Sequence, residues 1–150
     1  MTQFKCATVD DVPTLLQLLP LYYACDHLDY EASKAESGLR QLISDSGLGE
    51  VWLIQDKSAA RAIGYLALTF GFSLEFGGRE AFVDELFILE EFRGQGLGSQ
   101  AIQHAIRRCG EIGLTAIRLE VTRDNAKAGQ LYQRLGFKDF GRSLLAYELA

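Results

Sequence analysis

The sequence predicts a three-layer α/β domain, and three observations support this prediction. Segments of strand type and helix type alternate along the 150 residues. A glycine-rich loop at residues 93–99 joins a predicted strand directly to a strongly amphipathic helix. No internal repeat and no proline- or serine-rich linker divides the chain, so residues 1–150 are expected to form a single domain.

The composition excludes several classes of protein. Hydrophobic residues make up 48% of the chain, which is enough for a continuous core. The net charge of -5 argues against nucleic-acid partners, because a basic face must replace the phosphate counterions. Cys6, Cys25 and Cys109 form no C-x-x-C pair, so no metal site or disulfide is expected. The amino-terminal residues lack a signal-peptide pattern, and Gln17 and Pro20 interrupt the first apolar stretch; we expect a cytoplasmic protein with no membrane partner.

The first third of the chain is predicted to hold one short strand and two helices. Residues 4–9 have strand character, and Asp10 or Asp11 is suited to cap the helix that follows. A polar connection then leads to a second helix at about 31–44, which glycines starting at Gly47 stop. The inward face of the first helix comprises Val12, Leu15, Leu16, Leu18 and Leu19.

The middle of the chain is predicted to form adjacent strands. Residues 51–55 and 63–76 alternate partly in polarity, as half-buried strands do. Gly77 and Gly78 match a tight hairpin turn because both tolerate positive φ, and the partner strand is expected at 80–89.

The last third continues the alternation of helix and strand. A helix is predicted at 97–112, a strand at 116–121, a short helix at 125–135 closed by Gly136, and a final strand at 144–149. One face of the first of these helices is apolar and should pack on a sheet: Leu97, Ala101, Ile102, Ala105, Ile106, Cys109 and Ile112.

The glycine-rich loop is suited to hold a pyrophosphate. The first turn of a helix has unpaired N–H groups and a partial positive charge, and glycines let a phosphate approach closely. Arg93 would add a charge-assisted contact. The alternative is a connector that needs glycine only for tight packing of strand against helix. The functional interpretation is favoured because three glycines fall within five residues.

The spacing of the glycines excludes one phosphate ligand and disfavours another. A nucleoside-triphosphate loop requires a lysine after its last glycine, and none follows Gly98. A dinucleotide fold requires G-x-G-x-x-G, whereas Gly94, Gly96 and Gly98 give G-x-G-x-G. Glu120 imitates the ribose-binding acid of that fold, but too little chain follows it for the further strand–helix units.

Two motifs carry a resemblance to the GNAT family of N-acyltransferases. RGQGLG at residues 93–98 resembles the coenzyme A-binding motif R/Q-x-x-G-x-G/A, and NAKAGQLYQRLGF at 125–137 resembles N-x-x-A-x-x-L-Y-x-x-x-G-F. The likeness is sharp over about 82–137. It implies a mixed, mostly antiparallel, splayed sheet flanked by helices. It also implies transfer of an acetyl group from acetyl-CoA to a primary amine, with no metal.

The resemblance assigns residues to the coenzyme. The backbone of Leu86, Phe87 and Ile88 would pair with the pantetheine arm and polarise the thioester carbonyl. Asn125 either contacts the coenzyme or caps the helix it opens. The pyrophosphate would lie on Arg93, Gly94, Gln95, Gly96, Leu97, Gly98 and Ser99.

Proton transfer needs an acid and a base, and the sequence offers three candidates. Tyr132 matches the tyrosine that acts as general acid in the family; the alternative is a core aromatic residue. Asp84 aligns with the position of the base, beside Glu85. Since strand side chains alternate, a regular strand would turn only one of the two acids toward the cleft, and an irregular strand would exchange their roles. The alternative interpretation is that one or both acids lie at a solvated strand edge and have no catalytic role.

Acidic residues around the expected cleft favour a cationic acceptor amine. Polyamines, aminoglycosides, amino acids, lysine side chains and protein N-termini all remain open. A catalytically silent coenzyme A-binding module is the alternative function, and the sequence leaves open whether the chain forms a homodimer. Cys25 with His27 is a weak candidate for an acyl-cysteine mechanism, and His104 is expected at the surface without a role. The acidic residues are Asp26, Asp29, Glu31, Glu75, Glu80, Asp84 and Glu85.

Overall fold

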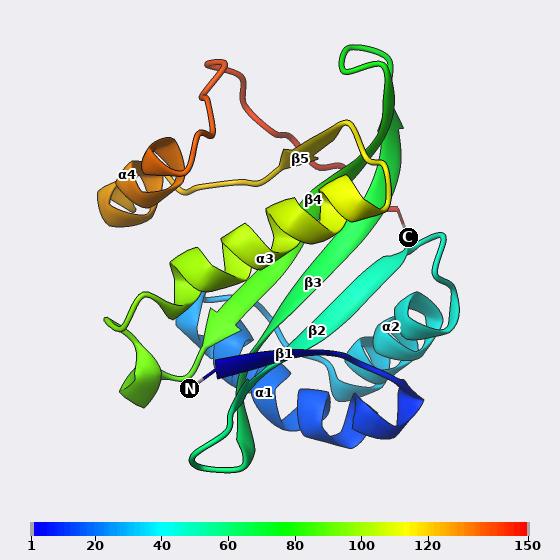
Figure 1. Cartoon of the computed structure of the whole chain (residues 1–150). Coiled ribbons are helices and arrows are strands. Elements are labelled where there is room, and N and C mark those ends of the chain that lie inside the picture. The colour runs from blue at the N-terminus through cyan, green and yellow to red at the C-terminus, as the bar shows by residue number, and fades with distance from the viewer. Residues whose placement is uncertain (1, 150) are drawn as a thin grey trace. The chain divides into compact units, whose positions relative to one another are not determined.

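The computed structural model describes residues 2–149, which form an α/β fold around one five-stranded mixed sheet (Figure 1). The strand order is β1-β2-β3-β4-β5; the first four strands are antiparallel, and β5 is parallel to β4. The strands are β1 (Thr2–Cys6), β2 (Gly49–Asp56), β3 (Arg61–Ser73), β4 (Gly78–Ile88) and β5 (Ala116–Arg118).

The chain divides into two compact units. The first unit ends at Arg118 and contains the whole sheet, and the second begins at Leu119 and contains one helix. The helices are α1 (Val12–Cys25), α2 (Ala32–Ser44), α3 (Leu97–Glu111) and α4 (Ala126–Arg134), with 3-10 turns η1 (Val9–Asp11) and η2 (Glu90–Phe92). The prediction of a single domain over 1–150 stays a prediction.

The first unit has three layers, as the sequence predicts. Helices α1 and α2 cover one face of the sheet and α3 covers the other (Figure 1). Alternating strand residues supply the two cores; Leu53, for example, faces α1 and Ile54 faces α3. The first core comprises Ala7, Leu15, Leu18, Leu19, Leu39, Val51, Leu53, Tyr65, Ala67 and Phe87, and the second comprises Ile54, Ile63, Ile88, Leu97 and Ala101.

Helix α1 begins after a capping box and is longer than the sequence predicts. The carboxylate of Asp11 accepts hydrogen bonds from the backbone N–H of Thr8 at 2.8 Å and from Lys5 Nζ at 2.9 Å. The helix continues through Pro20 to Cys25. Tyr22 and Tyr23 therefore lie in the last turns of this helix.

The β3–β4 hairpin differs from the predicted two-residue turn. Ser73 pairs with Gly78, so the loop has four residues, Leu74–Gly77. The Ser73 hydroxyl accepts from the Phe76 N–H at 3.1 Å, and Gly77 takes φ +76°. The prediction was wrong because it did not include this side-chain contact, which ends β3 early.

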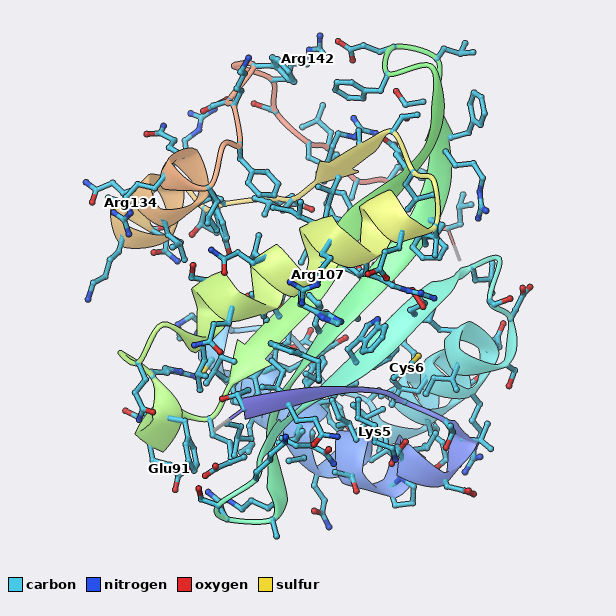
Figure 2. The ribbon with its side chains drawn as sticks, in the orientation of Figure 1. Lys5, Cys6, Glu91, Arg107, Arg134 and Arg142 are labelled. Carbon is cyan, nitrogen blue, oxygen red and sulfur yellow. The ribbon has the colours of Figure 1, made fainter. Side chains whose placement is uncertain are left out.

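His104 is half-buried on the α3 face of the sheet, and the expectation of a surface position was wrong. Its ring stacks on Phe4 at 4.5 Å and meets the edge of Trp52 at 4.4 Å. Arg108 lies over the Trp52 ring and forms a bidentate ion pair with Glu50 at 2.8 Å. Figure 2 shows the neighbouring Arg107 along the same helix. The imidazole serves here as an aromatic packing group.

The second unit contains α4 and a long carboxyl-terminal segment. The predicted strand at 144–149 is absent from the described part of this segment. Its apolar side chains are open to solvent, with Leu145 and Tyr147 each 89% exposed. The alternating pattern is typical of a strand, but a strand needs a neighbouring edge to pair with, and residues 144–149 belong to none of the strands of the described sheet.

Residues 2–149 contain neither a membrane-spanning helix nor a metal-binding cluster. None of their helices combines the length and apolarity that crossing a bilayer requires. They also contain no group of three or more histidine, cysteine or acidic side chains placed to hold a metal ion.

Candidate active site

A cavity of about 440 Å³ opens between α1, α2 and the sheet. Its floor is formed by β3 and β4, which place carboxylates and a tyrosine there, and its walls come from the two helices and their connection. The lining residues are Leu19, Tyr23, Asp29, Tyr30, Glu31, Lys34, Ala35, Gly38, Leu39, Leu42, Tyr65, Ala67, Asp84 and Glu85.

A β-bulge brings Asp84 and Glu85 into this cavity together. Ala67 on β3 lies opposite Glu85, whereas the next residue, Leu68, lies opposite Val83. Asp84 is therefore the extra residue of the bulge, and the strict alternation of side chains is interrupted there. A regular strand would have turned one of the two carboxylates away.

Two tyrosine hydroxyls hold the Glu85 carboxylate. Tyr23 on α1 donates to Oε2 at 2.7 Å, and Tyr65 on β3 donates to Oε1 at 2.8 Å. Burial raises the pKa of Glu85, the two hydroxyls oppose the shift, and the charge of Asp84 adds to it. Burial and the Glu85 charge in turn raise the pKa of Tyr65, while burial and the hydrogen bond to Glu85 raise that of Tyr23. Both phenols thus remain donors at neutral pH.

The Asp84 side chain is more open to solvent than Glu85. Partial burial nevertheless raises the pKa of the Asp84 carboxyl. A carboxylate with a raised pKa binds a proton more readily near neutral pH, which suits a general base.

Only some of the acidic residues expected around the cleft line the cavity. Asp29 and Glu31 do so from the α1–α2 connection. Glu80 does not line the cavity, and its carboxylate is paired with Arg118 on β5. Sequence reasoning missed Tyr23 and Tyr65 as partners of Glu85; the crowding of tyrosines after residue 21 was a signal for the first, but nothing in the sequence pointed to the second.

The glycine-rich loop has the geometry of an anion cradle. Gly94 and Gly96 adopt left-handed φ values of +77° and +79°, and Gly96 immediately precedes α3. A Cβ atom added at Gly94, Gly96 or Gly98 would meet nothing within 4 Å. The backbone before and within the first turn of α3 is therefore open to a ligand, while the Leu97 side chain is buried in the core and fixes the turn.

Arg93 is held against β4. Its Nε donates to the Ile88 carbonyl at 2.8 Å, its guanidinium lies over the Phe87 ring, and Nη2 is 3.5 Å from Cys25 Sγ. The predicted side-chain contact with a pyrophosphate would need this guanidinium to turn. Cys25 is exposed at this contact, and neither Cys25 nor His27 lines the cavity.

One edge of β4 is open on the side away from β3. The N–H of Leu89 donates to Ile63 O at 2.8 Å, and hydrogen-bonded pairs alternate along an antiparallel ladder. Leu86 and Ile88 therefore direct their backbone polar groups away from β3. The strand β5 pairs only with residues 80–82, so beyond Phe82 no strand of the sheet pairs with β4 on this side.

The second unit contains the remaining predicted residues. Burial raises the pKa of Tyr132, whose ring meets Phe137 edge-on at 5.9 Å, so its hydroxyl stays protonated at neutral pH. Asn125 caps α4, because its Oδ1 accepts the Ala128 N–H at 3.2 Å. Capping was one of the two roles that the sequence left open for Asn125.

Known proteins resemble this chain in sequence and in structure. Thialysine N-epsilon-acetyltransferase of Bos taurus is 32% identical over 77 residues, which are 51% of this chain and 45% of that protein. Peptidyl-lysine N-acetyltransferase YjaB of Salmonella typhimurium is 39% identical over 61 residues, 41% of this chain and 39% of that protein. The chain therefore spans less than half the length of these two relatives.

A solved structure covers more of the chain. Integron cassette protein HFX_CASS3, from the mobile metagenome of the Cole Harbour salt marsh, is 34% identical with a TM-score of 0.86. The match covers 99% of this chain and 91% of that protein. A model of the acetyltransferase (GNAT) family matches residues 14–137, which is most of the chain. With its bulged β4, glycine-rich loop and mixed sheet, the chain belongs to the GNAT acetyltransferase family.

Proposed function

We propose that the protein transfers the acetyl group of acetyl-CoA to a cationic primary amine. The observation that carries this proposal is the bulge, which brings Asp84 and Glu85 into one cavity on the strand that leads to the glycine-rich loop. Carboxylates on the cavity floor attract an ammonium ion and can remove its proton. Relatives named for acetylation of thialysine and of peptidyl-lysine support an amine acceptor.

The coenzyme fits the chain along two surfaces. The backbone of residues 93–99 would hold the pyrophosphate, since the loop leaves room for it and α3 begins there. The outward backbone groups of Leu86 and the Ile88 N–H would pair with the pantetheine amides, and one N–H of this edge would polarise the thioester carbonyl; the Ile88 carbonyl already accepts from Arg93. Phe87 lies between these residues and faces the core.

Three side chains then take part: one attracts the amine and two transfer protons. Glu85, held by two tyrosines, would attract the ammonium group, and Asp84 would accept its proton. The amine nitrogen forms a bond to the acetyl carbon as the carbon–sulfur bond breaks. The Tyr132 hydroxyl would donate its proton to the departing thiolate.

The lining of the cavity supports direct transfer within a ternary complex. Among the described residues that line it, there is no cysteine, serine or histidine. A covalent acyl-enzyme would need a nucleophile and an adjacent base at the cavity. Cys25 lies instead against Arg93.

The direct test is release of the coenzyme A thiol from acetyl-CoA across a panel of polyamines, aminoglycosides, amino acids, lysine peptides and N-terminal peptides. We expect release with at least one class of primary amine. Binding of acetyl-CoA without transfer to any amine would contradict the proposal and support a silent coenzyme-binding module instead.

A tyrosine pair tests the general acid. Tyr132→Phe should lower kcat by about 10²-fold, the usual size of a general-acid contribution, while the Tm changes little. Tyr147→Phe is the matched control, because this tyrosine is exposed in the same unit. Equal turnover in the two variants would mean that Tyr132 is not the acid.

A further inference from the structure

The face of α2 that borders the cavity contains a glycine without a packing reason. Lys34, Ala35, Gly38 and Leu42 recur at helical spacing along this face. A Cβ atom at Gly38 would meet nothing within 4 Å. Glycine inside a helix is unfavourable relative to alanine, and close approach of a neighbouring segment is its usual explanation. The space beside Gly38 is instead part of the cavity.

One wall of the cavity is apolar, whereas acidic groups, Lys34 and three tyrosines line the rest. Leucine and alanine side chains from α1, α2 and β3 form this wall. An alkyl chain can be buried against such a wall at no polar cost. The hydroxyls of a sugar amine would lose water against this wall without gaining partners from it. The apolar lining residues are Leu19, Ala35, Leu39, Leu42 and Ala67.

Tyr23 contacts both Glu85 and Tyr30 of the α1–α2 connection. Tyr23 donates to Glu85, and its ring meets Tyr30 edge-on at 5.5 Å, next to the acidic residues of the α1–α2 connection. Tyrosine faces and carboxylates together form a favourable site for an alkylammonium group. An ammonium bound there would leave its carbon chain to lie along the apolar wall of α2.

We propose that Gly38 keeps a slot open for the carbon chain of the acceptor, so that the acceptor is a primary ammonium on an unbranched alkyl chain. This inference rests on the proposed acetyl transfer and names the acceptor class for the same cavity. The same chemistry occurs in free alkylamines and in lysine side chains of peptides. A leucine at position 38 would fill the slot.

The matched variants are Gly38→Leu and Gly110→Leu. Gly110 lies in α3, on the other face of the sheet, and also has open space around its Cβ position. Both substitutions replace a helical glycine with a good helix former, so each should retain or raise the Tm. Gly38→Leu should lower kcat/KM for hexylamine about tenfold and leave KM for acetyl-CoA unchanged, whereas Gly110→Leu should change neither.

The panel separates the acceptor classes. Wild-type kcat/KM should be higher for hexylamine, free lysine or a lysine peptide than for an aminoglycoside. The ratio of kcat/KM for the peptide to kcat/KM for the free amine shows whether the acceptor is a peptide side chain or a small amine. A higher value for the aminoglycoside, or equal acceptor kinetics in the two leucine variants, would overturn the inference.

A binding measurement keeps this test separate from the test of catalysis. Calorimetry of hexylammonium chloride with the protein should show weaker binding to Gly38→Leu than to Gly110→Leu. If no amine is acetylated by wild type but this difference is found, the proposed function fails and the slot stands. If acetylation occurs without any difference in binding or kinetics, the slot fails and the function stands.

Discussion

At the scale of single residues, the pKa of Glu85 is set by the opposed effects of burial and hydrogen bonding. Burial favours its protonated form, and the hydroxyls of Tyr23 and Tyr65 favour the carboxylate. The net effect raises the pKa of Glu85 in the folded protein. The stability linked to this group is therefore fully present below the unfolded-state pKa and is lost as pH rises through the folded-state pKa.

Tyr23→Phe should make this loss larger. Without the hydroxyl, the pKa of Glu85 rises further, so the variant should be destabilised more at about pH 8 than at about pH 5, with a penalty at the higher pH of roughly 1–3 kcal/mol. Urea unfolding at the two pH values measures the difference. Tyr22→Phe provides the control, since the structure shows no hydrogen bond between its hydroxyl and Glu85. The same penalty at both pH values would contradict this account of Glu85.

Asp84 and Glu85 should differ in the kinetic parameter that each one controls. Asp84→Asn should lower kcat by about 10²-fold or more and abolish the acid limb of the pH profile, because the base must be ionised to act. Its raised pKa places that limb at higher pH than for an ordinary carboxyl. Glu85→Gln should mainly raise KM for the amine. A pH–rate profile of each variant measures both effects. If Glu85→Gln lowered kcat and Asp84→Asn mainly raised KM, Glu85 would be the base and Asp84 would bind the amine.

At the scale of elements, the start of α3 combines backbone strain with ligand access. Gly96 and Gly113 lie at opposite ends of this helix and have the same φ of +79°, with open space around both Cβ positions. A substitution at either position has the same conformational cost. A difference in KM for acetyl-CoA between the two variants would therefore come from contact with the ligand.

Gly96→Ala and Gly113→Ala should each cost about 1–2 kcal/mol, the usual penalty for alanine at positive φ. Only Gly96→Ala should also raise KM for acetyl-CoA, because its Cβ would enter the proposed cradle. Thermal unfolding and initial-rate kinetics on the two variants test this prediction. A similar KM in both would place the pyrophosphate elsewhere.

The elements could largely be predicted from the sequence, because apolar periodicity and glycine punctuation are local signals. Helix α3 begins at the predicted residue, Leu97, and α2 begins one residue after the predicted start. The features that build the site are not local. The bulge at Asp84 depends on the register with β3, and the bonds to Glu85 join residues 20 and 62 positions away. The strand predicted at 144–149 shows the same limit, since pairing requires an edge that its own residues cannot specify.

At the scale of the whole molecule, the proposed reaction requires both units to act on one coenzyme. No residue of α4 is fully buried, and Tyr132 is only partly so, so the helical hydrogen bonds of α4 should open easily.

Sizing by light scattering would separately decide between a monomer and a homodimer, which the sequence leaves open.

Hydrogen exchange should therefore show weak protection in α4 and strong protection in the central strands β2 and β3. Addition of acetyl-CoA should increase protection both at residues 93–99 and in α4, since binding would order the groups that contact the coenzyme. Mass spectrometry of exchanged peptides measures this with and without acetyl-CoA. If acetyl-CoA increased protection from exchange only at residues 93–99 and not in α4, Tyr132 would not be the acid that protonates the thiolate.

Trp52 is the single tryptophan of the chain, so its intrinsic fluorescence reports on one site. Its indole touches the imidazole of His104, and burial together with the Arg107 charge lowers the pKa of that imidazole. Since an imidazolium quenches a neighbouring indole, emission should fall only when the solution becomes more acidic than free histidine requires. His104→Phe should abolish this quenching while retaining an aromatic ring. Fluorescence thus follows the seating of α3 on the sheet without any added dye.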